Sequence, residues 1–227
     1  MYKILEYLPG IPRILSTGTK DRRPFIVMER MSITLEDYRK DDLLPKTESF
    51  IADLAGKLLK LLRSIHLRGI VHGDIKPANI GLRFHNSHVI PFVFDFGKAT
   101  RWQAGAVAPP PTTMTGTLIF ASVNALAGEV PSPRDDIISL VYTLIYVIAH
   151  SLPWTWDPRC TAKELSWSTR LHSIVAMKKI GTILLNGGVP DDLVDLLEHA
   201  SSLQFGDIPD YAQFISVFER LAMTTSS

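Results

Sequence analysis

The chain has 227 residues, of which 46% are hydrophobic and 21% are charged, a composition that excludes a disordered or fibrous protein and predicts a globular one. Its formal net charge is only +1 and its lysines and arginines are scattered, which excludes a basic stripe and predicts no nucleic-acid partner. The single cysteine, Cys160, excludes an internal disulfide framework and is typical of a reducing compartment.

The first third of the chain predicts a helix end, a strand and a long helix. The opening residues MYKILEYL have the pattern of a helix end that Pro9-Gly10 stops, and they lack the order of segments found in a secretory signal. The apolar run PFIVME, residues 24–29, is typical of a strand. Thr47 is placed to cap a long amphipathic helix that Gly69 ends. That helix carries apolar residues at helical spacing: Ile51, Leu54, Leu58, Leu61, Leu62 and Ile65.

The remainder of the chain changes from short strands to helices. Two strand-like stretches, around residues 80–82 and 89–94, are followed by a loop rich in Pro, Thr and Gly over residues 103–117. From Asp135 onward only helices are predicted: an apolar helix that ends at Ala149, and further helices over residues 166–185, 191–203 and 211–222. The apolar helix is shorter than the ~20 residues that a membrane span needs. We therefore predict an intracellular protein, cytoplasmic or nuclear, that makes no membrane contact.

Two polar motifs beside the predicted strands, VHGDIKPANIGL and VFDFGKAT, carry the candidate chemistry. Transfer of a phosphoryl group needs a side chain that orients the attacking hydroxyl, and oxygen ligands that hold Mg²⁺ against the phosphates. Asp74 is suited to orient the hydroxyl and accept its proton, and Lys76 to offset charge on the transferred group. Asn79 and Asp95 supply oxygen ligands for Mg²⁺, and Gly97 permits the turn that follows.

Each motif alone has a simpler interpretation. The tripeptide DFG occurs often by chance, and a lone His-Gly-Asp is usually only a turn. Their joint occurrence, in this order and separated by the length of a strand, favours the chemical interpretation. His72 is an exception, because we expect it to pack beneath the loop as a structural residue and not to act as a base.

These motifs resemble the catalytic loop and metal-binding segment of protein kinases. The rest of the chain is similar to the casein kinase 1 superfamily, which includes the vaccinia-related kinases. Three stretches carry this resemblance, in the order and spacing of the family: GTLIFASVN from Gly116, RDDIISL from Arg134 with SLPW after it, and SLQFGDIPDY from Ser202. His-Gly-Asp in place of His-Arg-Asp is similar to the vaccinia-related branch. The resemblance spans essentially the whole chain.

The resemblance implies a Ser/Thr protein kinase that uses ATP and Mg²⁺ and acts on a protein substrate. It implies an α+β fold that is a mainly helical kinase C-terminal lobe, over residues 32–227, with only a remnant of the N-terminal β-lobe over residues 1–31. That remnant comprises the end of helix C, strands and the hinge. In the family, a Gly-rich loop and a phosphate-binding Lys precede the residues that match MYKILEYL. We therefore expect this polypeptide alone to bind ATP poorly and to transfer little phosphate.

The resemblance also assigns roles to single residues. Thr117 is expected to hydrogen-bond with Asp74 and Lys76 in the catalytic set, which is a feature of Ser/Thr specificity. Asp136 is expected to hold the backbone of the catalytic loop, with N-capping of its own helix as the alternative. Met28 corresponds to the gatekeeper of the adenine site. The residues expected to bind the nucleotide and its metal are the gatekeeper and hinge positions Met28, Glu29 and Met31, with Lys76, Asn79 and Asp95; Asn79 and Asp95 are also the expected metal ligands.

Two other functions remain open at this point. A non-catalytic pseudokinase or interaction module is favoured by the missing upstream motifs, although the catalytic loop is intact. A small-molecule phosphotransferase of the aminoglycoside type shares His-Gly-Asp and a downstream Asn, but Lys76-Pro77, DFG and Gly116-Thr117 favour a protein kinase. The oligomeric state cannot be inferred from these patterns.

Overall fold

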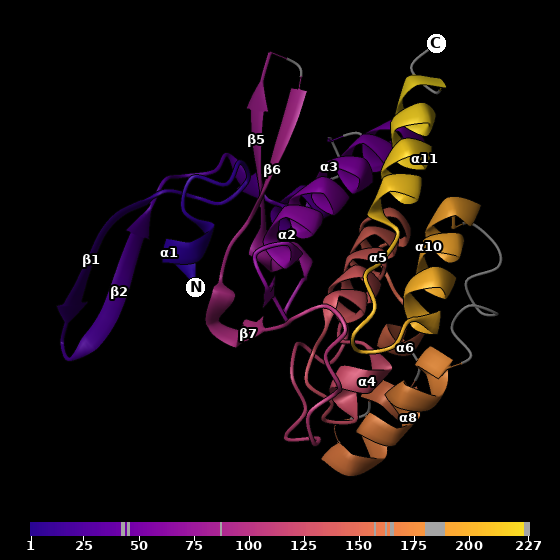
Figure 1. Ribbon diagram of the computed structural model, residues 1–227. Coiled ribbons are helices and arrows are strands. Elements are labelled where there is room, and N and C mark those ends of the chain that lie inside the picture. The colour runs from indigo at the N-terminus through magenta and orange to yellow at the C-terminus, as the bar shows by residue number, and fades with distance from the viewer. Residues whose placement is uncertain are drawn as a thin grey trace.

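A β-hairpin projects from a mainly helical body in the computed structural model of the chain (Figure 1). The structure describes residues 1–41, 44, 46–86, 88–156, 158–161, 163, 166–179 and 189–224. Within these ranges the strands lie in the first half and helices dominate the second half, as an α+β fold of mainly helical character requires. No helix in the described ranges combines the length and the apolar character needed to cross a membrane.

The projecting hairpin consists of β1 (Ile14–Lys20) and β2 (Arg23–Met28), which pair antiparallel. Its two turn residues, Asp21 and Arg22, both have positive φ, which matches the twist of tight hairpins. β2 confirms the strand predicted over PFIVME. β1 was not predicted, because its sequence ILSTGTK has no alternating apolar pattern.

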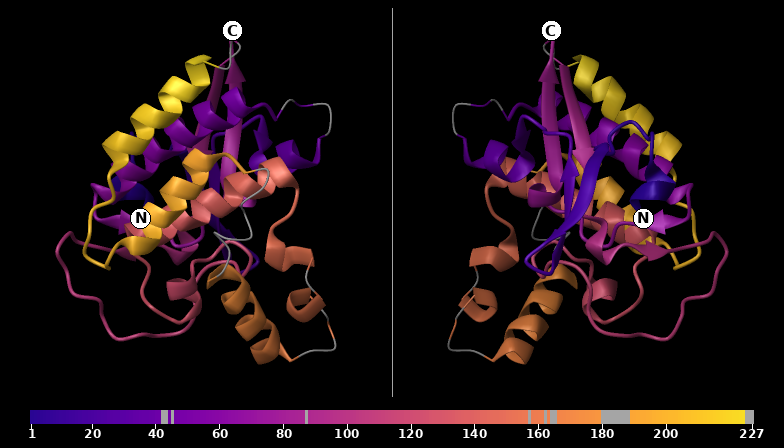
Figure 2. Two further views of the ribbon diagram at one scale, coloured as in Figure 1. Left: turned by 90° about the vertical axis from the view of Figure 1, so that its right-hand side faces the viewer. Right: turned by 90° about the vertical axis from the view of Figure 1, so that its left-hand side faces the viewer.

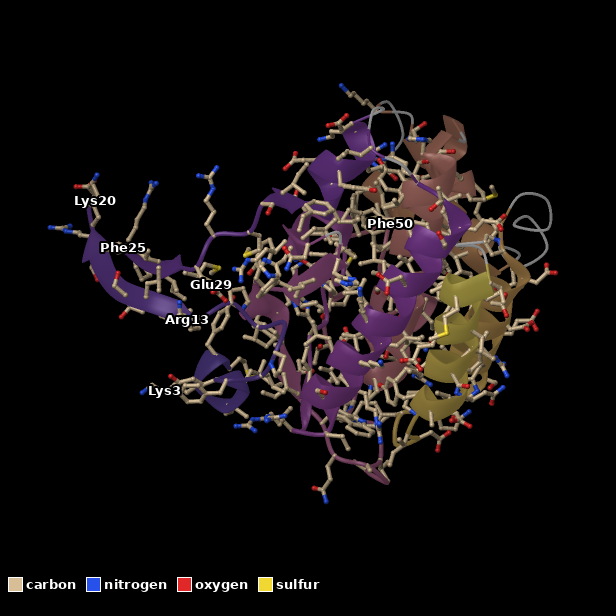
Figure 3. All side chains as sticks on the ribbon, turned by 90° about the horizontal axis from the view of Figure 1, so that it is seen from above. Lys3, Arg13, Lys20, Phe25, Glu29 and Phe50 are labelled. Carbon is tan, nitrogen blue, oxygen red and sulfur yellow. The ribbon has the colours of Figure 1, made fainter. Side chains whose placement is uncertain are left out.

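Apolar side chains of the hairpin face solvent. Phe25, Ile26 and Val27 are 43%, 49% and 41% exposed. Figure 3 shows Lys20 and Phe25 on the part of the hairpin that extends away from the body, whereas Phe50 lies within the body. An apolar two-stranded ribbon with free edges tends to pair with other chains unless something covers it.

The helical body is built around α3 (Glu48–His66), which confirms the predicted long helix. Thr47 caps it as expected, because its Oγ1 accepts the N–H of Phe50 at 3.2 Å. α3 packs against α11 (Tyr211–Thr224) and α5 (Pro133–Ala149). α10 (Asp191–Ser202) packs against α5 in turn. The predicted helices near the C-terminus are thus present.

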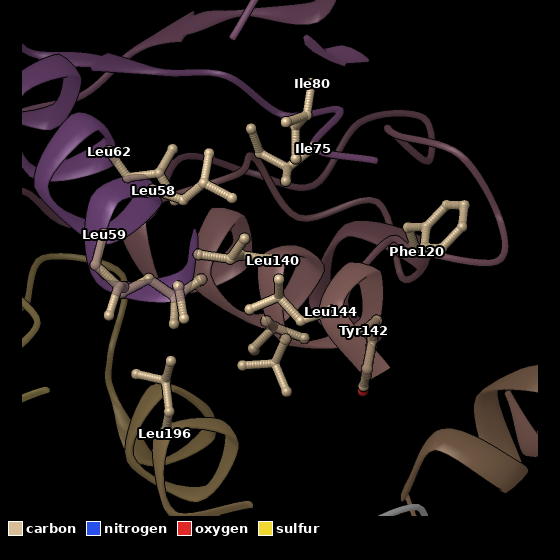
Figure 4. Close-up of a cluster of buried hydrophobic side chains, with 14 of the residues drawn as sticks. Leu58, Leu59, Leu62, Ile75, Ile80, Phe120, Leu140, Tyr142, Leu144 and Leu196 are labelled. Atoms are coloured by element: carbon tan, nitrogen blue, oxygen red, sulfur yellow. The ribbon is translucent and has the colours of Figure 1, made fainter. Parts of the chain in front are cut away.

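The core lies between these helices. Figure 4 shows Leu58, Leu59 and Leu62 of α3 in one buried cluster with Leu140 and Leu144 of α5. Burial of one leucine side chain stabilises the folded state by roughly 1.5–3 kcal/mol.

The Leu58 side chain provides a test of this core. Leu58 is 1% exposed, and we expect Leu58→Ala to lower the free energy of unfolding by about 2–5 kcal/mol, because it removes buried methyl groups and leaves a cavity. Leu67, which is 73% exposed at the end of the same helix, supplies the control Leu67→Ala with an expected change below about 0.5 kcal/mol. Urea unfolding of both variants measures the difference. Equal losses would contradict the placement of Leu58 in the core.

Two small antiparallel sheets lie at the edge of the body. In the first, β5 (Ile80–His85) is the middle strand between β3 (Ile33–Thr34) and β6 (His88–Val93). In the second, β4 (Ile70–Val71) pairs with β7 (Thr100–Arg101). β5 and β6 correspond to the two strand-like stretches of the sequence, although β5 extends further than expected.

These sheets bring the two polar motifs together. The loop after β4 ends in the 3-10 helix η1 (Pro77–Asn79), and the segment after β6 contains the 3-10 helix η2 (Phe96–Lys98). Beyond the last pair of the β5–β6 ladder, the N–H of Phe94 donates to the carbonyl of Asn79 at 3.1 Å. Asp95, the next residue, therefore lies beside the end of the catalytic-type loop.

Short helices complete the fold, and most of them were not predicted. α1 (Tyr2–Leu5) matches the expected helix end near the start of the sequence. The others follow loops or prolines and are too short to show a periodic pattern. They are α2 (Leu35–Lys40), α4 (Val123–Leu126), α6 (Pro153–Trp156) and α7 (Pro158–Thr161).

α8 (Trp167–Lys179) is the described part of the helix predicted over residues 166–185, and residues 180–185 lie outside the described ranges. It lies below α5 and α10 in both views of Figure 2. Between β7 and α4 the chain forms no regular element, which agrees with the loop predicted over residues 103–117, and it follows a wide arc beside the body.

Candidate active site

The candidate site is centred on the carboxylate of Asp74, which is 6% exposed in the loop after β4. Its Oδ1 accepts the hydroxyl of Thr117 at 2.7 Å, and its Oδ2 accepts Lys76 Nζ at 3.0 Å. Lys76 Nζ also donates to Thr117 Oγ1 at 2.9 Å. Both hydrogen bonds expected between Thr117 and the loop, one with Asp74 and one with Lys76, are therefore present.

The electrostatics of this cluster favour an ionised Asp74. Burial raises the pKa of the Asp74 carboxyl, but the hydrogen bonds from Thr117 and Lys76 and the charges of Lys76 and Lys98 outweigh it. The pKa of Asp74 is consequently lower than its ordinary value. The carboxylate is charged throughout the neutral range and can accept a hydrogen bond from an incoming hydroxyl.

Asn79 and Asp95 have the oxygen chemistry of a Mg²⁺ site. Asn79 is buried, and its Nδ2 donates to the Asp74 carbonyl at 2.9 Å, which identifies Oδ1 as the atom available to a metal. Asp95 is exposed and has left-handed backbone, with φ 66° and ψ 65°. Such a conformation is uncommon outside glycine, although Asp adopts it more readily than most residues, and it occurs both in turns and at functional sites.

These two residues fit a metal that arrives with a phosphate ligand. No group of three or more His, Cys, Asp or Glu side chains is gathered as a metal cage in the described part of the chain. Mg²⁺ in phosphoryl-transfer sites is held by one or two carboxylates together with substrate phosphates and water. Asp95 can supply the carboxylate and Asn79 an amide oxygen, which is the number of protein ligands that such a site needs.

Comparison with known proteins identifies the family. The sequence profile described as "Protein kinase domain" matches residues 2–202. The chain belongs to the protein kinase family. It is also 30% identical over 232 residues to the casein kinase 1-like protein HD16 of Oryza sativa subsp. japonica, in an alignment that covers 97% of this chain and 31% of that protein. The predicted resemblance to casein kinase 1 is thus confirmed, and the chain spans about a third of the length of this relative.

Lys98 is a residue of this kinase domain that the sequence analysis missed. It follows the DFG segment directly, and its Nζ donates to the Gly116 carbonyl at 2.8 Å and lies 3.5 Å from Asp74 Oδ2. The carboxylate of Asp74 is therefore flanked by two ammonium groups. The position of Lys98 beside DFG was visible in the sequence, but nothing in the spacing shows that a long side chain folds back towards Asp74.

His72 packs beneath the loop of the kinase domain, as expected. Its Nδ1 accepts the N–H of Asp74 at 3.2 Å, and its Nε2 faces the Phe94 carbonyl at 3.0 Å, so the network assigns the proton to Nε2. The ring is fully buried against Phe96, with 4.7 Å between ring centres. Burial lowers the pKa of His72, and the side chain is a neutral spacer.

Asp136 holds the loop backbone from below. Its Oδ2 accepts the N–H of His72 at 2.7 Å and its Oδ1 accepts the N–H of Gly73 at 2.8 Å. His66 Nε2 bonds the same carboxylate at 2.8 Å, and the other His66 nitrogen bonds the Tyr211 hydroxyl. The sequence analysis predicted the role of Asp136 but missed His66 and Tyr211, which lie far away along the chain.

The alternative role of Asp136, N-capping of α5, is filled by Ser132, the N-cap residue, together with Asp135, which completes a capping box. Asp135 Oδ2 accepts the N–H of Ser132, the residue before α5, at 2.8 Å. The burial of Asp136 raises its pKa, but the hydrogen bond and charge of His66 and the N–H groups of the loop outweigh this effect. The pKa of Asp136 is therefore lower than its ordinary value, and its charge is fully compensated by donors.

The expected gatekeeper and hinge residues, Met28, Glu29 and Met31, lie on the connection between the hairpin and the body. Met28 ends β2, and the N–H of Glu29 donates to the Arg13 carbonyl at 2.9 Å. Met31 lies against Gly81, where an added Cβ would stand only 2.6 Å from Met31 Cγ. The space beside Gly81 is thus occupied by the Met31 side chain.

The metal-binding segment also contacts the first helix. The N–H of Asp95 donates to the Tyr2 hydroxyl at 3.0 Å. The Tyr2 ring meets Phe96 edge to face, with 5.2 Å between ring centres. Tyr2 is a further residue that the sequence motifs did not indicate.

Proposed function

We propose that this chain carries the acceptor site of a Ser/Thr protein kinase that transfers the γ-phosphate of ATP to hydroxyl groups of a protein. The observation that carries the proposal is the bonded cluster of Asp74, Lys76 and Thr117 beside the oxygen ligands Asn79 and Asp95. Phosphoryl transfer depends on positioning and charge compensation, which are the contributions of these side chains.

Each side chain has a defined part in the proposed reaction. ATP would supply the phosphoryl group, and Mg²⁺ would compensate the negative charge of its phosphates. The ionised Asp74 orients the acceptor hydroxyl and receives its proton, and Lys76 compensates negative charge beside it. Thr117 fixes the rotamer of Asp74 by donating to Oδ1. Asn79 and Asp95 hold the metal through their side-chain oxygens.

The nucleotide-binding part of the proposal concerns the hinge. We assign residues 1–31 to the nucleotide-binding lobe and residues 32–227 to the helical lobe. Met28, Glu29 and Met31 then border the adenine, with Met31 over Gly81 as its apolar floor. The 227-residue polypeptide alone is expected to bind ATP weakly. The β1–β2 hairpin of the proposed nucleotide-binding lobe has only two strands, and its apolar side chains face solvent instead of covering a nucleotide.

The test of the proposed function is a transfer assay with full-length protein. Radiolabelled γ-phosphate from ATP is expected to reach Ser or Thr of casein in the presence of Mg²⁺, and hydrolysis of the product to phosphoamino acids identifies the acceptor. Kanamycin and choline serve as competing acceptors. Transfer to these alcohols but not to protein would favour a small-molecule phosphotransferase, and absence of both transfer and ATP binding would favour a pseudokinase.

A second prediction isolates the metal ligand. With Mg-ATP at about 100 times its Kd, the full-length protein is expected to gain about 2.7 kcal/mol, a rise in Tm of roughly 5–10 °C. Asp95→Asn removes the carboxylate and is expected to abolish the Mg²⁺-dependent part of this rise. Asp195→Asn, an exposed change on α10, is the control and should retain the full rise. An undiminished Mg²⁺ effect in Asp95→Asn would contradict the metal assignment.

A further inference from the structure

Lys178, in the last turn of α8, is a buried cation that the proposed chemistry does not use. It is 5% exposed, and burial lowers the pKa of its ammonium well below the ordinary value, whereas the carbonyl oxygens and aromatic rings around Nζ favour the charged form. A buried charge is tolerated only where polar groups compensate it. The groups that contact Lys178 therefore indicate which part of the structure this side chain stabilises.

The ammonium is held by carbonyl oxygens and aromatic rings. Nζ donates to the carbonyls of Leu118 at 3.1 Å, Ile119 at 3.0 Å and Ala121. An ammonium group has three N–H donors, so all of them are satisfied by this one segment. Within the described ranges, the rings of Tyr142 and Trp154, each with 4.8 Å from Nζ to the ring centre, add cation–π contacts.

The segment that Lys178 holds is joined directly to the catalytic cluster. The N–H groups of Phe120 and Ala121 both donate to the Thr117 carbonyl at 2.8 Å, which makes residues 117–121 one tight turn. Thr117, the first residue of this turn, donates to Asp74 at 2.7 Å. One turn therefore connects the two side chains: Lys178 binds its carbonyls at residues 118–121, and Thr117 at its start bonds the Asp74 carboxylate.

A second side chain supports the same turn. The indole N–H of Trp154, in α6, donates to the Ile119 carbonyl at 2.9 Å. Figure 4 shows Phe120 and Tyr142 on the side of the cluster that lies away from Leu58, Leu59 and Leu62. Side chains from α5, α6 and α8 therefore meet beneath residues 117–121.

We propose that Lys178 is a positioning residue for the protein substrate: it fixes the turn of residues 117–121 as the platform on which the acceptor segment of the substrate lies. This inference rests on the proposed kinase function. The side chains of Leu118 and Ile119 are only half-buried, which leaves the platform accessible from outside. The hydrogen bonds of Lys178 in the described ranges go to residues 118–121 and not to Met28, Met31 or Asp95, so we expect its effect on nucleotide binding to be smaller than its effect on peptide binding.

The test separates peptide binding from nucleotide binding in the full-length protein. Lys178→Met keeps an unbranched side chain that is one atom shorter but removes its donors, and is expected to raise KM for a phosphorylatable peptide at least about tenfold. KM for ATP and the Tm rise with Mg-ATP should stay within about twofold of the wild type. Lys178→Arg keeps a donor cation and should recover part of the peptide affinity. The adjacent exposed Lys179→Met is the matched control, with no expected change.

A milder variant keeps the test valid if Lys178→Met does not fold. Trp154→Phe keeps an aromatic ring at this position but removes the N–H bond to the Ile119 carbonyl and part of the buried ring volume, and is expected to raise the peptide KM about threefold. Its control is Trp102→Phe, which removes an indole bond to the Phe205 carbonyl elsewhere.

Three outcomes would overturn the inference. They are an unchanged peptide KM in Lys178→Met and Trp154→Phe, an equal loss of ATP and peptide affinity, or the same peptide effect in the control variants. An inactive wild-type protein would overturn the proposed function as well, whereas an active wild type with unaffected variants overturns only the role of Lys178.

Discussion

Replacing Asp74 by Asn is expected to lower kcat for phosphoryl transfer to a Ser/Thr peptide by about 10²- to 10⁴-fold. The amide has nearly the same shape, so Thr117 can still bond its oxygen, but it cannot receive the proton of the acceptor hydroxyl. It also removes the negative charge that Lys76 and Lys98 share. Initial rates at saturating Mg-ATP measure the effect.

A matched substitution checks that the loss is local. Asp53 forms a half-exposed ion pair with Lys57 on α3, away from the loop of Asp74, and Asp53→Asn should change kcat by less than about twofold. Because the pKa of Asp74 is depressed, the loss in Asp74→Asn should be the same from pH 6 to 8, where the wild-type carboxylate stays charged. A rate within tenfold of the wild type would end the assignment of Asp74 as the proton acceptor.

Asp136→Ala is expected to lower the free energy of unfolding by about 3–5 kcal/mol at pH 7. The substitution leaves the N–H groups of His72 and Gly73 without their acceptor and removes the carboxylate from His66. Buried donors that lose a partner each cost about 1–3 kcal/mol. Guanidinium unfolding measures this, and Asp195→Ala on the surface of α10 is the control, with an expected loss below about 0.5 kcal/mol.

The pH dependence of this loss follows from the sign of the Asp136 pKa shift. Its pKa in the folded state is lower than the value of about 3.9 expected in the unfolded chain. The stabilisation is therefore fully present above that value and is lost as pH falls through the folded pKa. The difference between wild type and Asp136→Ala should be constant from pH 5 to 8 and should shrink under more acidic conditions. A difference that grows on acidification would contradict the assigned shift.

The parts of the fold that the sequence predicted are those whose signals are local. α3 has a capping Thr47 and a long run of apolar residues at helical spacing, so both its start and its buried face could be inferred. The apolar composition of α5 marked it as a core helix in the same way. β1 and α2 escaped prediction because neither is long enough, or apolar enough, to show a period.

The same distinction holds for the candidate site, where residues within a motif could be predicted and residues brought in by tertiary packing could not. Asp74, Lys76, Asn79 and Asp95 lie within two short motifs, where spacing along the chain sets their distance in space. Tyr211 and Lys178 reach the site from helices near the C-terminus, and Tyr2 reaches it from the first helix. Their contributions depend on how α1, α8 and α11 pack, which no local pattern encodes. Tertiary contacts of this kind require the folded structure.

The contact of Tyr2 with Asp95 has a consequence for control of the site. The hydroxyl of Tyr2 holds the backbone N–H of Asp95, and its ring holds Phe96, so one side chain secures a residue in left-handed backbone. A displacement of α1 would break both contacts together, because the hydroxyl and the ring belong to the same side chain. The orientation of the proposed magnesium ligand therefore depends on the position of the first helix.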